Sequence, residues 1–132
     1  MPQSKSQTHI TPDRIYQIIE EEWGYTKDSM HDPCPANTPY KSSMFFNGLY
    51  GDLEEINYIN PPYHNLSEWV MHAVNQTYKN KKTIMLLPAK TDQSWFHILI
   101  NFDYKIKWIH KRLKFKNNIH HSTQPHFLVL IK

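Results

Sequence analysis

INPPYHNLSEW, residues 59–69, is the stretch that decides the fold and the chemistry of this chain. It places two prolines directly after the apolar run EINYI (55–59) and directly before a segment with helical spacing. Because proline has no backbone N–H, a proline pair ends a strand and leaves rigid backbone with carbonyls outside the ladder. Asn60 and Tyr63 flank the pair, so the tetrapeptide predicts a functional loop.

The NPPY residues suit the methylation of an exocyclic amino group on a nucleobase. Such a nitrogen is a poor nucleophile because its lone pair is delocalised into the ring. The side-chain oxygen of Asn60 and the carbonyl of Pro61 would accept both hydrogens and draw the nitrogen towards a tetrahedral geometry. Tyr63 offers a face on which an extruded base stacks, a contact worth on the order of 1–3 kcal/mol. No strong base is needed, because the amine becomes acidic once it is methylated, and positioning supplies most of the rate.

The alternative for this tetrapeptide is a surface turn or a short polyproline ligand segment. The strand pattern before it, the helix pattern after it and its aromatic fourth residue favour the functional loop. Two other proline-containing segments, DPCP (32–35) and LPAKTD (87–92), also follow strand-like runs. Since ligands bind beyond the carboxyl ends of strands in open α/β sheets, we expect these three loops to meet at one rim.

The first helical pattern is TPDRIYQIIEEEW (11–23). Thr11 is expected to cap this helix and Pro12 to occupy its first position, with Gly24 as the terminator. Two more helices are expected, one capped at Asn65 with an apolar stripe that reaches residue 78, and one that begins at Asp92.

Between the helical patterns lie runs typical of strands. A short strand is expected to end near Asp32, and a short strand with a turn is expected within 43–52. The other expected strands are 55–59, 81–89, 104–109, 112–115 and 126–131. Strands that alternate with helices predict an α/β fold with helices flanking a mostly parallel central sheet. The 132 residues have room for one domain, 1–132, whose first seven residues are expected to be flexible.

Composition narrows the cellular setting. The single cysteine, Cys34, rules out an internal disulfide and is typical of a reducing compartment. No apolar run is long enough to cross a bilayer, and the first residues lack a signal-peptide pattern. We therefore expect a cytoplasmic protein without a membrane partner. The scattered histidines, such as His31, do not provide four well-spaced zinc ligands, so no metal is expected.

A basic stretch, KIKWIHKRLKFK (105–116), carries six lysine or arginine residues and no acidic one. One interpretation is a solvated edge strand whose lysines prevent aggregation. The other is a strip that contacts phosphates, with Trp108 and Phe115 interleaved for base or sugar contact. Both interpretations stay open at the level of composition.

Taken in chain order, the motifs resemble one family, the phage-type, Dam-like DNA N6-adenine methyltransferases. The matching motifs are TP (11–12), DPCP (32–35), NGL (47–49), NPPY (60–63), Trp69, LLPAKTDQSWFH (86–97) and RLKF (112–115). NPPY alone is shared by methyltransferases that act on adenine, on cytosine and on protein glutamine, so the combination carries the resemblance. The family often has glycine where this chain has Lys111.

The resemblance implies a reduced class I, Rossmann-like methyltransferase fold that uses S-adenosylmethionine as cofactor. The catalytic residues it implies are Asn60, Pro61, Pro62 and Tyr63. The cofactor-binding residues it implies are Thr11, Pro12, Asp32, Pro33, Cys34 and Asn60. The residues it implies for substrate and nucleic acid are Lys90, Thr91, Asp92, Trp95, His97, Lys111, Arg112 and Lys114.

The function we expect is methyl transfer from S-adenosylmethionine to the N6 amino group of adenine in DNA, by a site-specific adenine methyltransferase. A chain of this length has no separate target-recognition domain, which predicts short sequence selectivity or a homodimer. A partner subunit could also complete an adenosine pocket that the short 33–59 segment leaves partial. The alternatives are a nucleic-acid-binding protein of the same fold without turnover, and the same chemistry on RNA or cytosine. Richness in Lys, Asn, Ile and Tyr points to an A/T-rich, viral genome.

Overall fold

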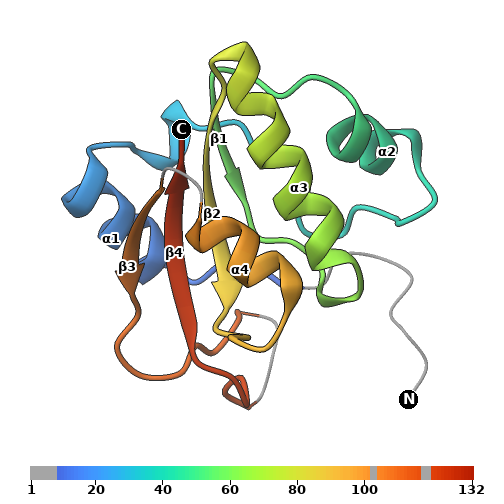
Figure 1. The fold of residues 1–132 in the computed structure, drawn as a ribbon. Helices are drawn as coiled ribbons and strands as arrows, with labels where there is room; N and C mark the ends of the chain where they lie inside the picture. The colour runs from blue at the N-terminus through green and yellow to red at the C-terminus, as the bar shows by residue number, and fades with distance from the viewer. Residues whose placement is uncertain (1–8, 102–103, 117–119) are drawn as a thin grey trace.

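A four-stranded sheet lies at the centre of the fold, with helices packed on its faces (Figure 1). The computed structural model describes residues 9–101, 104–116 and 120–132. The strands are β1 (Ile56–Ile59), β2 (Lys82–Pro88), β3 (Tyr104–Trp108) and β4 (His126–Ile131), in the spatial order β1-β2-β4-β3. The α-helices are α1 (Asp13–Trp23), α2 (Ser43–Tyr50), α3 (Leu66–Gln76) and α4 (Ser94–Ile100).

The sheet is mixed, and the expectation of a mostly parallel sheet was wrong for the described part of the chain. β1 pairs with β2 in parallel, whereas β4 pairs antiparallel with both β2 and β3. A parallel connection needs a crossover of a dozen or more residues, usually a helix. No helix is described between β3 and β4, so the last strand returns antiparallel and inserts between β2 and β3.

Both faces of the sheet are buried, because successive side chains of a strand point to opposite faces. Met85 of β2 packs in the cluster that contains Trp69 of α3 and Leu99 of α4. The next residue, Leu86, packs on the other face with Ile15 of α1. In Figure 1, α3 and α4 accordingly cross the front of the sheet. This two-sided burial explains why β2 and β4 read as continuous apolar runs.

Two segments expected to be strands have another structure. Residues 43–50 form the helix α2, in which Phe45 and Leu49 are buried one turn apart. The side chain of Ser42 caps this helix by accepting a hydrogen bond from the Phe45 N–H (3.2 Å). The RLKF segment, 112–115, lies outside the sheet, although its alternating apolar side chains are buried.

The helix ends also differ from the expected ones. α1 begins after Pro12, and the hydroxyl of Thr11 makes a hydrogen bond with the Tyr58 hydroxyl (2.9 Å) in place of a cap. Gly24 ends the helix in the left-handed conformation (φ 81°), as predicted. Asn65 is the residue before α3 but makes no side-chain capping bond, and Gln93 rather than Asp92 precedes α4. α3 stops at residue 76, which leaves residue 78 of the expected stripe exposed.

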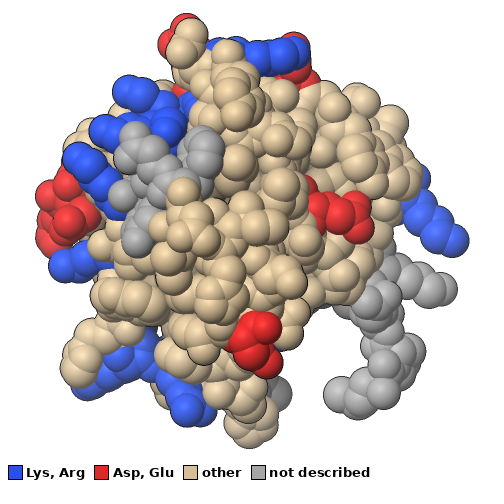
Figure 2. All heavy atoms as spheres, viewed as in Figure 1, with Lys and Arg blue, Asp and Glu red and all other residues tan. Residues whose placement is uncertain are grey.

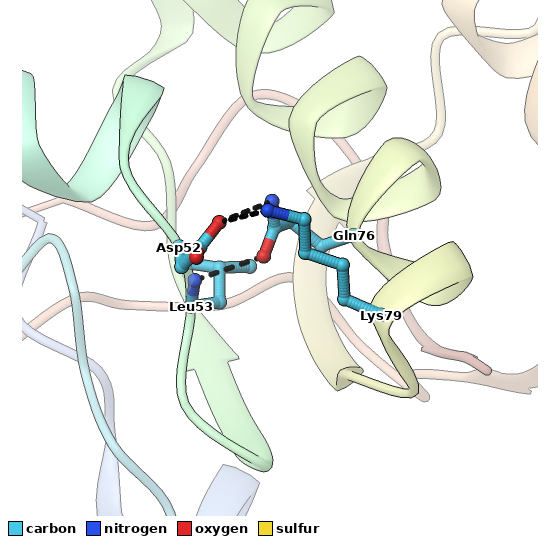
Figure 3. A network of polar contacts seen from close by, with 4 residues as sticks. All are labelled: Asp52, Leu53, Gln76 and Lys79. Carbon is cyan, nitrogen blue, oxygen red and sulfur yellow. Dashed lines mark hydrogen bonds and ion pairs between the residues drawn. The ribbon is translucent and has the colours of Figure 1, made fainter.

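A polar network joins the end of α3 to the chain that enters β1 (Figure 3). The Leu53 N–H donates to Gln76 Oε1 (3.0 Å), and Gln76 Nε2 donates to Asp52 Oδ1 (3.4 Å). Lys79 Nζ completes the network with an ion pair to Asp52 (2.7 Å). Because Gln76 is buried, its amide supplies the partner that the Leu53 N–H needs. The network therefore fixes the segment that precedes β1.

Candidate active site

Asn60 follows β1 directly, and its side-chain amide is held in one orientation. Its Nδ2 donates to the His9 carbonyl (2.9 Å) and to Thr11 Oγ1 (3.2 Å). Since both donors point to the N-terminal segment, the amide oxygen faces away from that segment. Asn60 is only 4% exposed, yet it lines a cavity of about 190 Å³ that Asp32 and Thr11 also line.

The DPCP loop lies beside this asparagine. A parallel bridge between His31 and Asn57 places the loop next to the end of β1. Asp32 Oδ1 accepts a hydrogen bond from the Cys34 N–H (2.9 Å), which fixes the turn. Burial raises the pKa of Asp32 to about 6, and the hydrogen bond from Cys34 opposes part of that rise. A carboxyl group perturbed in this way inside a cavity is typical of a functional site.

A second cavity, of about 570 Å³, lies between the DPCP loop and α2. Asp32 lines this cavity as well as the smaller one, together with Pro33, Asn47 and Leu53. α2 lies against the loop only because Gly48 has no side chain. A Cβ atom at Gly48 would stand 2.3 Å from the carbonyl oxygen of Pro33. The glycine of the NGL motif is therefore required for the wall of the cavity.

Tyr63 begins a short 3-10 helix, and its hydroxyl is fixed by a residue of β4. The hydroxyl lies 2.6 Å from His126 Nε2, and His126 Nδ1 lies 3.0 Å from the Gln124 carbonyl. Since a carbonyl only accepts, Nδ1 donates and Nε2 accepts the tyrosine proton. Burial lowers the pKa of His126 to about 4 and raises the pKa of Tyr63 to about 12. Both groups are therefore neutral at pH 7.

The ring of Tyr63 has neighbours from three other segments. The His9 ring meets it edge-on (centroids 4.5 Å apart), and His9 also stacks on Phe115 (4.6 Å). Lys90 Nζ stands 5.8 Å from the centre of the Tyr63 ring. Tyr63, Lys90 and Trp95 line a cavity of about 210 Å³. The N-terminal segment thus covers part of the NPPY loop.

The three proline-containing loops accordingly lie around Asn60 and Tyr63. The LPAKTD loop contributes Lys90, and Trp95 reaches the same cavity although most of its side chain is in the core. The other residues of this segment are exposed and have no described contact with Asn60 or Tyr63: Thr91, Asp92 and His97. His97 Nε2 instead bonds to the carbonyl of Thr91 (2.7 Å), which fixes the loop.

Of the remaining expected site residues, two line a cavity and three lie in the backbone next to one. Pro33 lines the cavity between the DPCP loop and α2, and Cys34 lines the cavity of Asn60. Pro61 and Pro62, the middle of the NPPY loop, are buried, and Pro12 lies at the start of α1. The structure places all of them close to Asn60 in the fold.

The part of the basic stretch (105–116) that follows β3, residues 109–116, lies in the connection between β3 and β4. Figure 2 shows lysine and arginine side chains gathered over the loop that joins β3 to β4, at the lower left. Arg112 and Lys114 are exposed, whereas the residues between and after them, Leu113 and Phe115, are buried. Lys116 lines the cavity of Asn60. The alternation leaves the cationic side chains available to a phosphate backbone.

Lys111 has a glycine-like backbone conformation, with φ of 64°. Arg14 donates to the carbonyls of His110 (3.1 Å) and Lys111 (3.5 Å) and so supports this turn. This turn places a side chain in the left-handed region, which costs backbone strain.

Lys111→Gly is therefore expected to raise the free energy of unfolding by about 1 kcal/mol, because it removes this strain. Urea unfolding of the variant measures the gain. Lys114→Gly is the matched control, since Lys114 is not among the residues with positive φ, and this variant should show no gain. Equal stability of the two variants would contradict the assignment of strain to Lys111.

Sequence reasoning missed His9 and His126 as members of the site. Each contacts Tyr63 from more than fifty residues away along the chain. A histidine carries no local pattern that predicts such a contact, so only the tertiary fold reveals it.

The described residues show neither a metal-holding group nor a membrane-spanning helix. Among residues 9–101, 104–116 and 120–132, no group of three or more His, Cys, Asp or Glu side chains is arranged to hold a metal ion. In the same part of the chain, every helix is too short or too polar to cross a membrane.

Comparison with known proteins gives one result that covers nearly all of the chain. A family model described as DNA N-6-adenine-methyltransferase (Dam) matches residues 1–127. No curated protein and no solved structure matches the chain.

Proposed function

The chain belongs to the DNA N-6-adenine-methyltransferase (Dam) family, and we propose that it uses its NPPY loop to methylate the N6 amino group of adenine with S-adenosylmethionine. One observation carries this proposal: Asn60 is held with its amide nitrogen towards the N-terminal segment, at a cavity shared with Asp32. We infer that the amide oxygen is the group that accepts an amino hydrogen of the target base.

The fold that we propose is a reduced class I methyltransferase. The parallel pairing of β1 with β2, and the parallel bridge at His31, bring the ends of three segments to one rim. Ligands bind at such a rim in open α/β sheets. The antiparallel β4 lies on the far side of β2 from this bridge, and its first residue, His126, contacts Tyr63 at the rim.

The residues present fit the proposed cofactor. The larger cavity combines apolar side chains, such as Met44 and Leu53, with the polar groups of Asp32 and Asn47. Cavities of this size, about 300–1,000 Å³, are typical of small-molecule sites, in which a few polar groups fix the orientation. The close packing at Gly48 keeps the loop of Asp32 against α2. Asp32 would accept hydrogen bonds from hydroxyl or amino groups of the cofactor.

When bound, S-adenosylmethionine supplies a methyl group on a positively charged sulfur. Asn60 Oδ1 and the Pro61 carbonyl accept the two hydrogens of the adenine amino group and direct its lone pair towards that methyl group. The positively charged sulfur would make this methyl group electrophilic and would leave as a neutral thioether that keeps the electron pair of the carbon–sulfur bond, so Asn60 and Pro61 need only orient the nitrogen. The methylated amine then loses one proton to water.

The target base must reach the ring of Tyr63. His9 lies against that ring, so base entry requires the His9 side chain to leave. Lys90 Nζ stands over the same ring, where it would contact a phosphate of the DNA strand that carries the base. Base–aromatic stacking of about 1–3 kcal/mol then compensates for part of the cost of extruding the base.

The test is transfer of a tritiated methyl group to single-stranded DNA, double-stranded DNA and RNA. The proposal expects label in DNA. It also expects the cofactor to stabilise the fold by about 2.7 kcal/mol at a hundredfold excess over Kd. Label in RNA alone would reassign the substrate. Binding to DNA with neither transfer nor thermal stabilisation would show a binding protein without turnover.

A further inference from the structure

The hydroxyl of Tyr63 is anchored across the fold to His126. The two side chains meet at 2.6 Å, although Tyr63 lies in the NPPY loop and His126 is the first residue of β4. His126 is only 1% exposed, so its hydrogen bonds replace those that water would make. The contact links the proposed base-stacking residue directly to the central sheet.

His126 is itself rigidly held on both of its sides. Its Nδ1 donates to the Gln124 carbonyl (3.0 Å), which fixes the tautomer and the ring orientation. Its backbone lies opposite Pro88 in the ladder with β2, and its carbonyl accepts from the Ile109 N–H (3.2 Å). The Nε2 atom therefore presents a fixed acceptor to the tyrosine hydroxyl.

We propose that His126 is a positioning residue, which holds the Tyr63 hydroxyl so that the tyrosine ring presents one plane to the target base. This inference rests on the proposed function, since it assigns a role in base stacking. Tyr63 begins a 3-10 helix of three residues, and so short an element does not fix its side chain. Tyr63 also packs against the core cluster of α3 and α4 and makes a hydrogen bond with the partly exposed Ser122. His9 must move for the base to enter, and Lys90 is a flexible side chain. His126 is the buried polar group that holds the hydroxyl from the sheet.

The matched variants are His126→Gln and His126→Asn, which carry the same amide on side chains that differ by one methylene. Glutamine can present its oxygen near the position of Nε2, whereas asparagine is too short to reach the tyrosine hydroxyl. We expect His126→Gln to keep kcat/KM for DNA within about threefold, and His126→Asn to lose on the order of tenfold to a hundredfold, the effect of a small misplacement.

Three further measurements separate positioning from a merely structural role. Thermal stabilisation by S-adenosylmethionine should be equal in both variants, because His126 lines none of the cavities to which Asp32 contributes. In a Tyr63→Phe background, His126→Asn should cause no further loss, because the hydroxyl is already absent. Val129→Ala, a buried change in the same strand, should lower stability and leave kcat/KM unchanged.

Base stacking gives a readout that does not depend on turnover. DNA with 2-aminopurine at the target position should show quenched fluorescence with the wild type and with His126→Gln, but not with His126→Asn. Absence of methyl transfer by the wild type would refute the proposed function, and the fluorescence comparison would then still decide the role of His126. Equal quenching and equal kcat/KM in the glutamine and asparagine variants would overturn the inference. So would an asparagine effect that persists in the Tyr63→Phe background.

Discussion

Asn60→Ala is expected to lower methyl transfer to DNA by on the order of 10² to 10³, the cost of removing one group that stabilises charge in a transition state. The variant loses the side-chain acceptor for the adenine amino group, while the Pro61 carbonyl remains. A tritiated-methyl assay at saturating S-adenosylmethionine measures the loss. Because the effect is on the reacting nitrogen, kcat should fall more than the affinity for DNA.

The same variant also loses the hydrogen bonds to His9 and Thr11, which should lower the free energy of unfolding by about 1–3 kcal/mol. Val129→Ala is the stability control, because truncation of this buried side chain costs a similar amount. If Val129→Ala keeps its activity while Asn60→Ala loses it, the loss belongs to the site. Unchanged transfer by folded Asn60→Ala would remove NPPY from the mechanism.

Asp32→Asn is expected to stabilise the fold and to weaken cofactor binding at the same time. Burial raises the pKa of Asp32 from 3.8 to about 6, so the folded state favours the protonated carboxyl. This contribution to stability is complete below pH 3.8 and is lost as the pH rises through about 6. Above that pH, the variant should exceed the wild type by about 2 to 3 kcal/mol, since its amide stays neutral.

The gain should vanish near pH 4, and urea unfolding at pH 4 and pH 8 measures it. Asp28→Asn, at an exposed carboxyl four residues earlier, is the control and should change stability little at either pH. Loss of a charged hydrogen-bond acceptor should weaken S-adenosylmethionine binding at pH 8 by tenfold or more, about 1.5–3 kcal/mol. If Asp32→Asn bound S-adenosylmethionine as tightly as the wild type does, Asp32 would not be part of the cofactor site.

Much of the fold could be predicted from the sequence, because its long elements carry strong periodicity. α1 and α3 show an apolar stripe at helical spacing, and β2 and β4 are continuously apolar over residues 84–88 and 127–131. Helix α2 was missed because it spans eight residues, of which only Phe45 and Leu49 mark a buried face. The direction of β4 was missed because apolar composition does not distinguish a parallel from an antiparallel neighbour in a sheet buried on both faces.

In the candidate site, too, the features with a local sequence pattern could be predicted and those set by tertiary contacts could not. Loops that come directly after strands could be expected to share a rim, and the structure places DPCP, NPPY and Lys90 around Asn60 and Tyr63. The hydroxyl of Thr11 could not be placed, because a local capping pattern and a distant partner at Tyr58 compete for it. His9 and His126 reach Tyr63 only through the tertiary fold.

Analysis of the methylated nucleoside tests the central claim most directly. DNA is incubated with the protein and labelled S-adenosylmethionine, digested to nucleosides and separated, with Asn60→Ala as the parallel sample. If Asn60 and Pro61 accept the hydrogens of an adenine amino group, the label should appear in N6-methyl-2′-deoxyadenosine with the wild type and be nearly absent with Asn60→Ala. Label in a methylated cytosine or at a ring nitrogen of adenine, or equal label from both proteins, would contradict it.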